Sequence, residues 1–155
     1  MNQKAASLIE YYGGGFQLLM PGITFPARFE FLDELREFVA DIARQNGFTD
    51  REIYSLQLAA DEAATNIIEH ACEEDSNASF DVTCGMQGDA LVIIMRDDGK
   101  PFDISKVKPP DLKADLSERQ IGGLGIYLMR KLMDEVRYES NSRTGNLLTM
   151  IKRRG

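Results

Sequence analysis

The chain has 155 residues, of which 43% are apolar, and its formal net charge is -7. This length and composition favour one domain with a single packed core and exclude a disordered chain. The acidic charge argues against duplex nucleic acid as a partner, because binding to phosphates needs a basic face. Two cysteines and one histidine argue against a disulfide framework and a histidine-based metal cluster.

The N-terminus carries no signal-peptide pattern. The longest strongly apolar run, Leu91 to Met95, is too short to span a bilayer. We therefore expect a soluble, cytoplasmic protein without a membrane partner.

The first part of the chain has weak local patterns. Residues 1–15 are expected to form an N-terminal arm, with a short helix over residues 3–12 that the glycines at 13–15 end. Residues 16–25 are apolar but contain Pro21-Gly22, which indicates an edge strand or two short strands. From residue 29 to about 46, apolar residues recur every three to four positions and predict a helix.

The second helix has the strongest pattern and is expected from Thr49 or Asp50 to about Glu73. Glu52 lies at the correct offset from Thr49 for a capping box. Small residues dominate the apolar stripe and would let this helix lie close against a sheet; the stripe consists of Leu56, Ala60, Ala63, Ile67 and Ala71.

The rest of the chain alternates between strands and one further helix. Residues 79–86 and 91–95 predict two strands joined by a turn at 87–89, and residues 136–141 and 147–152 predict a closing hairpin. A helix is expected from the glycines at 122–125 to about residue 133. The long polar segment before it, about 103–121, is typical of a lid. Together these elements predict an α/β protein of the α+β two-layer type: residues 16–155 form one domain, a mainly antiparallel mixed sheet with helices on one face.

Glu62 and Asn66 are four residues apart and share one face of the expected second helix. A carboxylate there can orient a nucleophile or accept its proton, and an amide oxygen can bind Mg²⁺, which prefers oxygen ligands. Such a pair, taken alone, is more often a solvated helix face.

Two glycine-containing motifs follow in order. Asp97 and Gly99 come directly after a strand, where a carboxylate can accept a hydrogen bond from an exocyclic amine such as that of adenine, and a glycine lets a flat base approach. Gly122-Gly123-Leu124-Gly125 opens a helix whose backbone N–H groups can face a phosphate. Each motif alone is also compatible with an ordinary turn or a flexible glycine segment, and the second is not a P-loop because no Gly-Lys-Ser/Thr follows.

The ordered combination resembles the GHKL, or Bergerat-fold, ATPase superfamily, and the likeness covers about residues 22–153. The three boxes of that superfamily correspond here to Glu62 and Asn66, to Asp97, Gly99 and Pro101, and to Gly123 and Gly125 with Leu124 between them and Gly122 before them. Pro101 stands where the second box has its second glycine. Within the superfamily the chain is most similar to the anti-sigma factor serine kinases of bacterial partner-switching systems.

The resemblance implies a role for each box. Asn66 would hold Mg²⁺, Glu62 would polarise a serine hydroxyl, and Asp97 would recognise adenine where Gly99 lets the base approach. Gly123 and Gly125 would cradle the phosphates of ATP. The implied activity is ATP-dependent phosphorylation of a STAS-type anti-anti-sigma protein, with a sigma factor as the competing partner and a homodimer as the assembly.

Two alternatives remain at this stage. One is a nucleotide-dependent binding module without transferase activity, against which the intact pair of Glu62 and Asn66 argues. The other is an α/β protein that binds no nucleotide.

Overall fold

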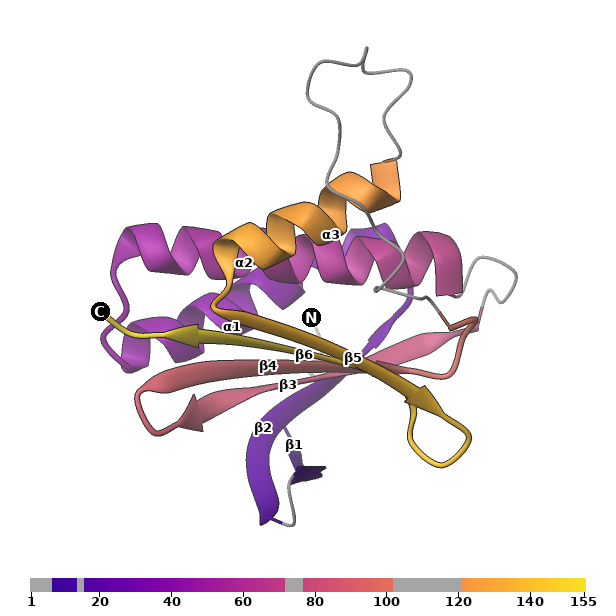
Figure 1. Cartoon of the computed structure of the whole chain (residues 1–155), viewed down its shortest axis with the longest axis horizontal. Helices are drawn as coiled ribbons and strands as arrows, with labels where there is room; N and C mark the ends of the chain where they lie inside the picture. The colour runs from indigo at the N-terminus through magenta and orange to yellow at the C-terminus, as the bar shows by residue number, and fades with distance from the viewer. Residues whose placement is uncertain (1–6, 14–15, 72–76, 102–120) are drawn as a thin grey trace.

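The computed structural model describes residues 7–13, 16–71, 77–101 and 121–155. In this part of the chain, a six-stranded sheet in the order β1-β2-β3-β4-β6-β5 lies against a layer of helices (Figure 1). Every pairing between these neighbouring strands is antiparallel. The expected two-layer α+β sandwich with helices on one face of a mainly antiparallel sheet is therefore confirmed.

The helices and strands are bounded as follows. The strands are β1 Ser7–Gly13, β2 Phe16–Pro26, β3 Ser79–Gln87, β4 Ala90–Asp97, β5 Glu135–Asn141 and β6 Gly145–Arg153. The helices are α1 Leu32–Gln45, preceded by the 3-10 turn Phe29–Phe31; α2 Asp50–Asn66, continued by the π-helical turn Ile67–Ala71; and α3 Ile121–Leu132. From residue 29 onward, the described elements agree in type with the sequence predictions and differ by a few residues at their ends.

The expected helix over residues 3–12 is wrong where the structure describes it, because residues 7–13 form strand β1. This stretch contains an isoleucine and two tyrosines, which favour strands. Its antiparallel partner is β2, with Ser7 opposite Gly22 and Gly13 opposite Phe16. A short isolated helix is only marginally stable, whereas pairing with β2 supplies interstrand hydrogen bonds. Residues 3–6, 14 and 15 lie outside the described part.

β2 is one continuous strand rather than two, and it runs between β1 and β3. Its pairing with β3 begins only at Gly22, so Pro21 has a paired strand on one side alone. A proline lacks the N–H that a central strand must donate, and this one-sided stretch accommodates it.

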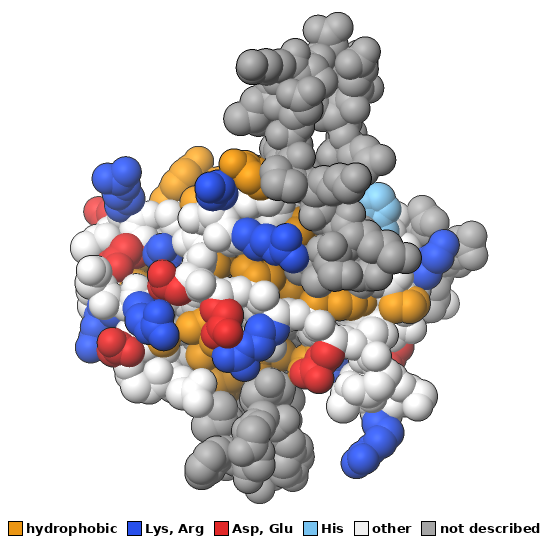
Figure 2. Space-filling model, in the orientation of Figure 1, with side chains coloured by type: hydrophobic (Ala, Val, Ile, Leu, Met, Phe, Trp, Pro, Cys, Tyr) orange, Lys and Arg blue, Asp and Glu red, His pale blue; other side chains and the backbone are white. Residues whose placement is uncertain are grey.

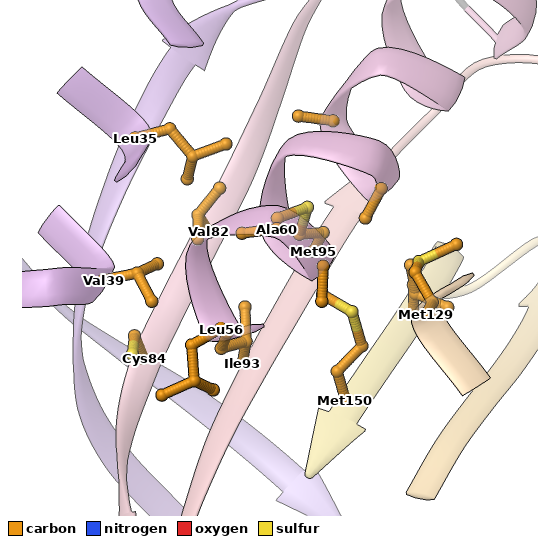
Figure 3. Packing of buried hydrophobic residues seen from close by; sticks show 14 of the residues in the cluster. Leu35, Val39, Leu56, Ala60, Val82, Cys84, Ile93, Met95, Met129 and Met150 are labelled. Carbon is orange, nitrogen blue, oxygen red and sulfur yellow. The ribbon is translucent and has the colours of Figure 1, made fainter. Parts of the chain in front are cut away.

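The main hydrophobic core lies between the sheet and the helices (Figure 3). α2 packs against both α1 and α3. Four alanines of α2 are almost fully buried, and their small side chains let the helix lie close to the sheet: Ala59, Ala60, Ala63 and Ala64. Side chains from the helices and from the sheet meet in Figure 3, including Leu35 of α1, Leu56 of α2 and Met150 of β6.

A smaller apolar cluster occupies the opposite face of the sheet. It consists of Met20, Val92, Ile94 and Leu147, with Ile151 packed against it. Alternation along β4 explains the division, since Leu91, Ile93 and Met95 point to the helices. Within the described residues, no helix is both long and apolar enough to cross a membrane.

Candidate functional site

Glu62 and Asn66 lie near the C-terminal end of α2, on the face that meets α3. The helix starts with the predicted capping box: Thr49 Oγ1 accepts a hydrogen bond from the Glu52 N–H at 3.2 Å, and the Thr49 N–H donates to Glu52 Oε1 at 2.8 Å. A Cβ placed on Gly125 of α3 would lie 2.8 Å from Glu62 Oε2 and 3.7 Å from Asn66 Nδ2. The absence of a side chain at residue 125 therefore lets α3 pack directly against the pair.

The glycine motif lies inside α3 rather than before it. α3 begins at Ile121, so Gly122, Gly123 and Leu124 belong to its first turn. The first N–H groups of a helix have no partner within it, and they attract anions together with the helix dipole. The expected lid boundary is corrected by one residue, because Ile121 belongs to α3; the rest of the predicted lid lies outside the described residues.

Glu62 is surrounded by other carboxylates. Partial burial raises the pKa of its side chain, and the negative charges of Asp61 and Glu69 raise this pKa further. A raised pKa brings a carboxylate closer to the range in which it exchanges protons near neutral pH, as a general base must.

Arg36 of α1 joins the site through Asp61, and the sequence patterns did not single it out. Its guanidinium donates hydrogen bonds to Asp61 and Asp33. The Arg36 carbonyl oxygen also accepts a hydrogen bond from Gln57 Nε2 at 3.2 Å, which ties α1 to α2. Arg36 therefore places a positive charge beside one of the carboxylates that act on Glu62.

The side-chain amide of Asn66 has a hydrogen-bond donor without a partner. Its Nδ2 atom is buried and has no hydrogen-bond partner among the described residues. A buried, unpaired polar group is costly, so it indicates a place where a ligand, an ion or water completes the structure. Asn66 thus has the character of a ligand-binding residue.

Asp97 lies at the end of β4 and is buried. Its Oδ1 atom accepts hydrogen bonds from the Gly99 N–H at 2.8 Å and from Asn146 Nδ2 at 2.9 Å. Asp97 also lines the cleft described below. The carboxylate is therefore fixed by the protein while one of its sides faces a space that a ligand can enter.

Asn146 is a second residue that sequence reasoning did not single out as part of the site. It lies directly opposite Asp97 in the pairing of β4 with β6 and is buried. The contact between the two side chains could not be predicted from local patterns, because the residues are 49 positions apart in sequence. A sequence pattern predicts a strand at 147–152 but not which strand lies beside it.

A cleft of about 500 Å³, open to solvent, joins the α2 and β4 residues. Asn66 and His70 line it from the α2 side, and Asp97 and Lys100 line it from the β4 side. Apolar side chains complete the wall: Ala63, Ile67, Ile126, Met129, Tyr138 and Leu148. The structure thus brings the first and second sequence motifs to one cavity, with Gly125 of the third beside Glu62.

The remaining predicted residues of the second motif lie at the rim. Gly99 is half-buried, and its N–H is held by Asp97. Pro101 is exposed and is the last described residue before position 121. Within the described ranges, no three His, Cys, Asp or Glu side chains form a cluster that could hold a metal ion.

Comparisons with known proteins place this architecture in a family. Residues 25–152 match the family described as the histidine kinase-like ATPase domain. The chain is similar to the serine-protein kinase RsbW of Bacillus subtilis (strain 168), with 37% identity over 76% of each chain. It is similarly related to RsbW of Bacillus licheniformis, with 37% identity over 82% of this chain and 81% of the relative. RsbW of Halalkalibacterium halodurans is 32% identical over 84% and 80% of the two chains.

These matches cover the helices and strands that carry Glu62, Asn66, Asp97 and Gly125. The three relatives are 32–37% identical to this chain over most of their length, and all three carry the same name. The chain therefore belongs to the histidine kinase-like ATPase family and, within it, to the group of serine-protein kinases.

Proposed function

We propose that the protein is an ATP-dependent serine/threonine kinase and anti-sigma factor that phosphorylates a STAS-type anti-anti-sigma protein. The observation that carries this proposal is one cleft that reaches both Asn66 and Asp97, with Glu62 beside it at the α2–α3 contact. The names of the relatives support transfer to a protein serine.

The β4 end of the cleft suits the adenine base. Asp97 offers a carboxylate to an exocyclic amine, and the apolar side chains of Ile126, Met129 and Leu148 suit the flat faces of the ring. Gly99 has no side chain that would hinder the base. The phosphates would then extend toward α2 and the first turn of α3, where Gly122, Gly123 and Gly125 would face them.

The α2 end fits a magnesium ion that is shared with ATP. Mg²⁺ is commonly held by one or two protein oxygens together with substrate phosphates, which agrees with a single amide ligand. Asn66 Oδ1 would be the ligand of the ion, and the buried Nδ2 donor, which has no partner among the described residues, would bind a phosphate oxygen. The ion would neutralise charge on the phosphates during transfer.

Glu62 would accept a hydrogen bond from the incoming serine hydroxyl and then its proton. The serine oxygen forms a bond to the γ-phosphorus, the bond between that phosphorus and the β–γ bridging oxygen breaks, and ADP leaves. The raised pKa of Glu62 suits proton acceptance. The lid, expected at about 103–121, would exclude water and favour transfer to protein over hydrolysis.

The partners follow from the same proposal. Phosphorylation would add charge to the STAS protein at the interface and release it, after which the kinase would bind a sigma factor. The net charge of -7, and the mixture of basic and acidic side chains on the face in Figure 2, suit protein partners rather than nucleic acid. A cytoplasmic homodimer is the expected working state.

Transfer of radiolabelled phosphate from ATP to a STAS protein encoded beside this gene tests the proposal. We expect the wild type to label it and Glu62→Gln to transfer at least about 100-fold more slowly, since general base catalysis contributes about 10²–10⁴. Glu34→Gln is the control, because this exposed carboxylate lies on α1 and is not one of the charges that raise the pKa of Glu62. Equal rates for wild type and Glu62→Gln contradict the assigned role, and Mg-ATP binding without transfer indicates the binding-module alternative.

The melting temperature of Glu62→Gln shows whether a loss of activity comes from the missing general base or from unfolding. The raised pKa of Glu62 means that the folded state disfavours its charged form. The free energy of unfolding therefore declines as the pH rises from the unfolded value toward the raised folded value. Glu62→Gln removes this decline, so the variant should be at least as stable as the wild type at neutral pH. A marked fall in its melting temperature would show that lost activity reflects unfolding.

A further inference from the structure

Asn146 has every hydrogen-bonding group of its side chain engaged. Its Nδ2 atom donates to Asp97 Oδ1 at 2.9 Å and to the Gly99 carbonyl oxygen at 2.8 Å. Its Oδ1 atom accepts a hydrogen bond from Ser140 Oγ at 2.7 Å. An amide has two N–H donors and one carbonyl acceptor, so each of these groups has a partner.

The network fixes which way the amide faces. If the amide were turned over, its oxygen would face Asp97 Oδ1 and the Gly99 carbonyl oxygen, which are both acceptors. Its N–H groups would then meet only Ser140. The observed orientation is therefore the one that directs donors at Asp97.

The two carboxylate oxygens of Asp97 therefore differ in their hydrogen bonds. Oδ1 accepts from both Gly99 N–H and Asn146 Nδ2, which uses its two lone pairs. Within the described residues, Oδ2 receives no hydrogen bond, and Asp97 lines the cleft. A ligand that enters the cleft therefore meets one free acceptor in a fixed position.

The sheet holds this arrangement through Gly145. Residue 145 has a positive φ of +74°, and a Cβ there would lie 2.7 Å from both the Asp97 carbonyl oxygen and Asp98 Oδ1. Glycine thus lets the start of β6 approach the end of β4 closely enough for Asn146 to reach Asp97.

We infer that Asn146 is a positioning residue which, by engaging Asp97 Oδ1, leaves Oδ2 to accept the 6-amino group of adenine and so sets the selection of ATP over purine nucleotides without that amine. Inosine and guanine carry an oxygen acceptor at the same ring position, which Oδ2 would repel. The inference rests on the proposed ATP site and adds a residue outside the cleft lining that acts on specificity.

Competition against a fluorescent ATP analogue, with Mg²⁺ present, tests the inference on the full chain. The probes are ATP, inosine triphosphate and purine riboside triphosphate, which has hydrogen at position 6. Asn146→Ala should weaken ATP binding about tenfold, because the Asp97 carboxylate loses a hydrogen bond that holds it in position. Its affinity for the other two nucleotides should change little, so the preference for ATP falls.

In Asn146→Asp the new side chain has almost the same shape as asparagine, so this variant provides the test if Asn146→Ala fails to fold. It places a second carboxylate against Asp97, and the preference for ATP over inosine triphosphate should fall further than in Asn146→Ala. Ser140→Ala is the matched control, because Ser140 bonds only the amide oxygen and should leave the preference almost unchanged.

Four results would overturn the inference. Equal weakening of all three nucleotides would indicate a purely structural role, and an unchanged preference in both Asn146 variants would show that Asp97 does not depend on Asn146. A wild type that binds ATP but not selectively also contradicts it. A wild type that binds no nucleotide overturns the proposed function itself, and this inference with it.

Discussion

Asp97 at the sheet end of the cleft and Glu62 at the helix end are both carboxylates, but the protein surrounds them differently. Asp97 is buried and receives two hydrogen bonds from protein donors. Glu62 lies beside two like charges, which together with burial raise its pKa, and it is next to the unpaired amide of Asn66. The sheet end is thus preorganised for recognition, whereas the helix end is incomplete until a ligand arrives.

The contrast also reflects the elements that carry each group. Asp97 and Asn146 are held by the pairing of two central strands. Glu62 and Asn66 depend on how α2 packs against α3, and the first residues of α3 follow a segment that the structure does not describe. Changes at the sheet end should therefore alter nucleotide affinity, and changes at the helix end should alter transfer.

Asp97→Asn is expected to have the largest effect on binding. The asparagine oxygen can still accept from Gly99 and Asn146, but its NH₂ group would replace Oδ2 and face the adenine amine with a donor. ATP affinity should fall on the order of 100-fold, since a hydrogen bond to a charged group contributes up to about 3 kcal/mol. Titration with a fluorescent ATP analogue measures this loss. The melting temperature should change little, and unchanged ATP affinity would contradict the adenine assignment.

Gly125→Ala tests the helix end and should lower the transfer rate about tenfold. The new Cβ would lie 2.8 Å from Glu62 Oε2, so the carboxylate or α3 must move, and small misplacements in a catalytic site can cost up to about 100-fold. Measurement of labelled phosphate on the STAS protein gives the rate.

A double-mutant cycle shows whether the effect acts through Glu62. Gly125→Ala should add little when Glu62 is already glutamine, because the displaced group is then inactive. If the two changes multiply their effects, Gly125 acts on the phosphates instead, as the resemblance implied.

The sequence predicted the features that local patterns encode. The capping box of Thr49 and Glu52, the small-residue face of α2 and the turn at Gly88 were all visible, because each depends on residues within a few positions. Residues 7–13 were wrongly expected to be helical, because the strand preference of their isoleucine and tyrosines was overlooked and the pairing with β2 cannot be predicted from a local pattern.

The same distinction divides the site. Spacing placed Glu62 and Asn66 on one helix face, and the order of the motifs suggested that Asp97 and Gly125 would join them. Arg36 and Asn146 were not identified, because their partners lie 25 and 49 residues away in sequence. Such contacts depend on helix packing and strand register, which a single sequence does not specify.

Arg36→Gln should have a smaller effect, which appears in the pH dependence of transfer. The change removes the positive charge that pairs with Asp61, so the negative charge of Asp61 acts more fully on Glu62. The pKa of Glu62 should rise, and the acid limb of the rate profile should move to higher pH. Asp33→Asn is the control, because Asp33 bonds the same guanidinium but is exposed. A profile that stays in place contradicts this coupling.

Thr49→Ala should have the smallest effect on function, because it changes the end of α2 that is remote from Glu62. It removes the hydroxyl that accepts from the Glu52 N–H and should lower the free energy of unfolding by about 1 kcal/mol.

The other half of the capping box predicts a pH dependence. The Glu52 carboxylate accepts a hydrogen bond from the Thr49 backbone N–H, and this bond lowers the pKa of Glu52. Its stabilising contribution is therefore present above the unfolded value and is lost as the pH falls through the lowered folded value. Urea unfolding at several pH values measures both contributions, and Glu52→Gln should differ less from the wild type in acid than at neutral pH. ATP affinity and transfer should stay unchanged in both variants; a loss of either would show that the two ends of α2 are coupled.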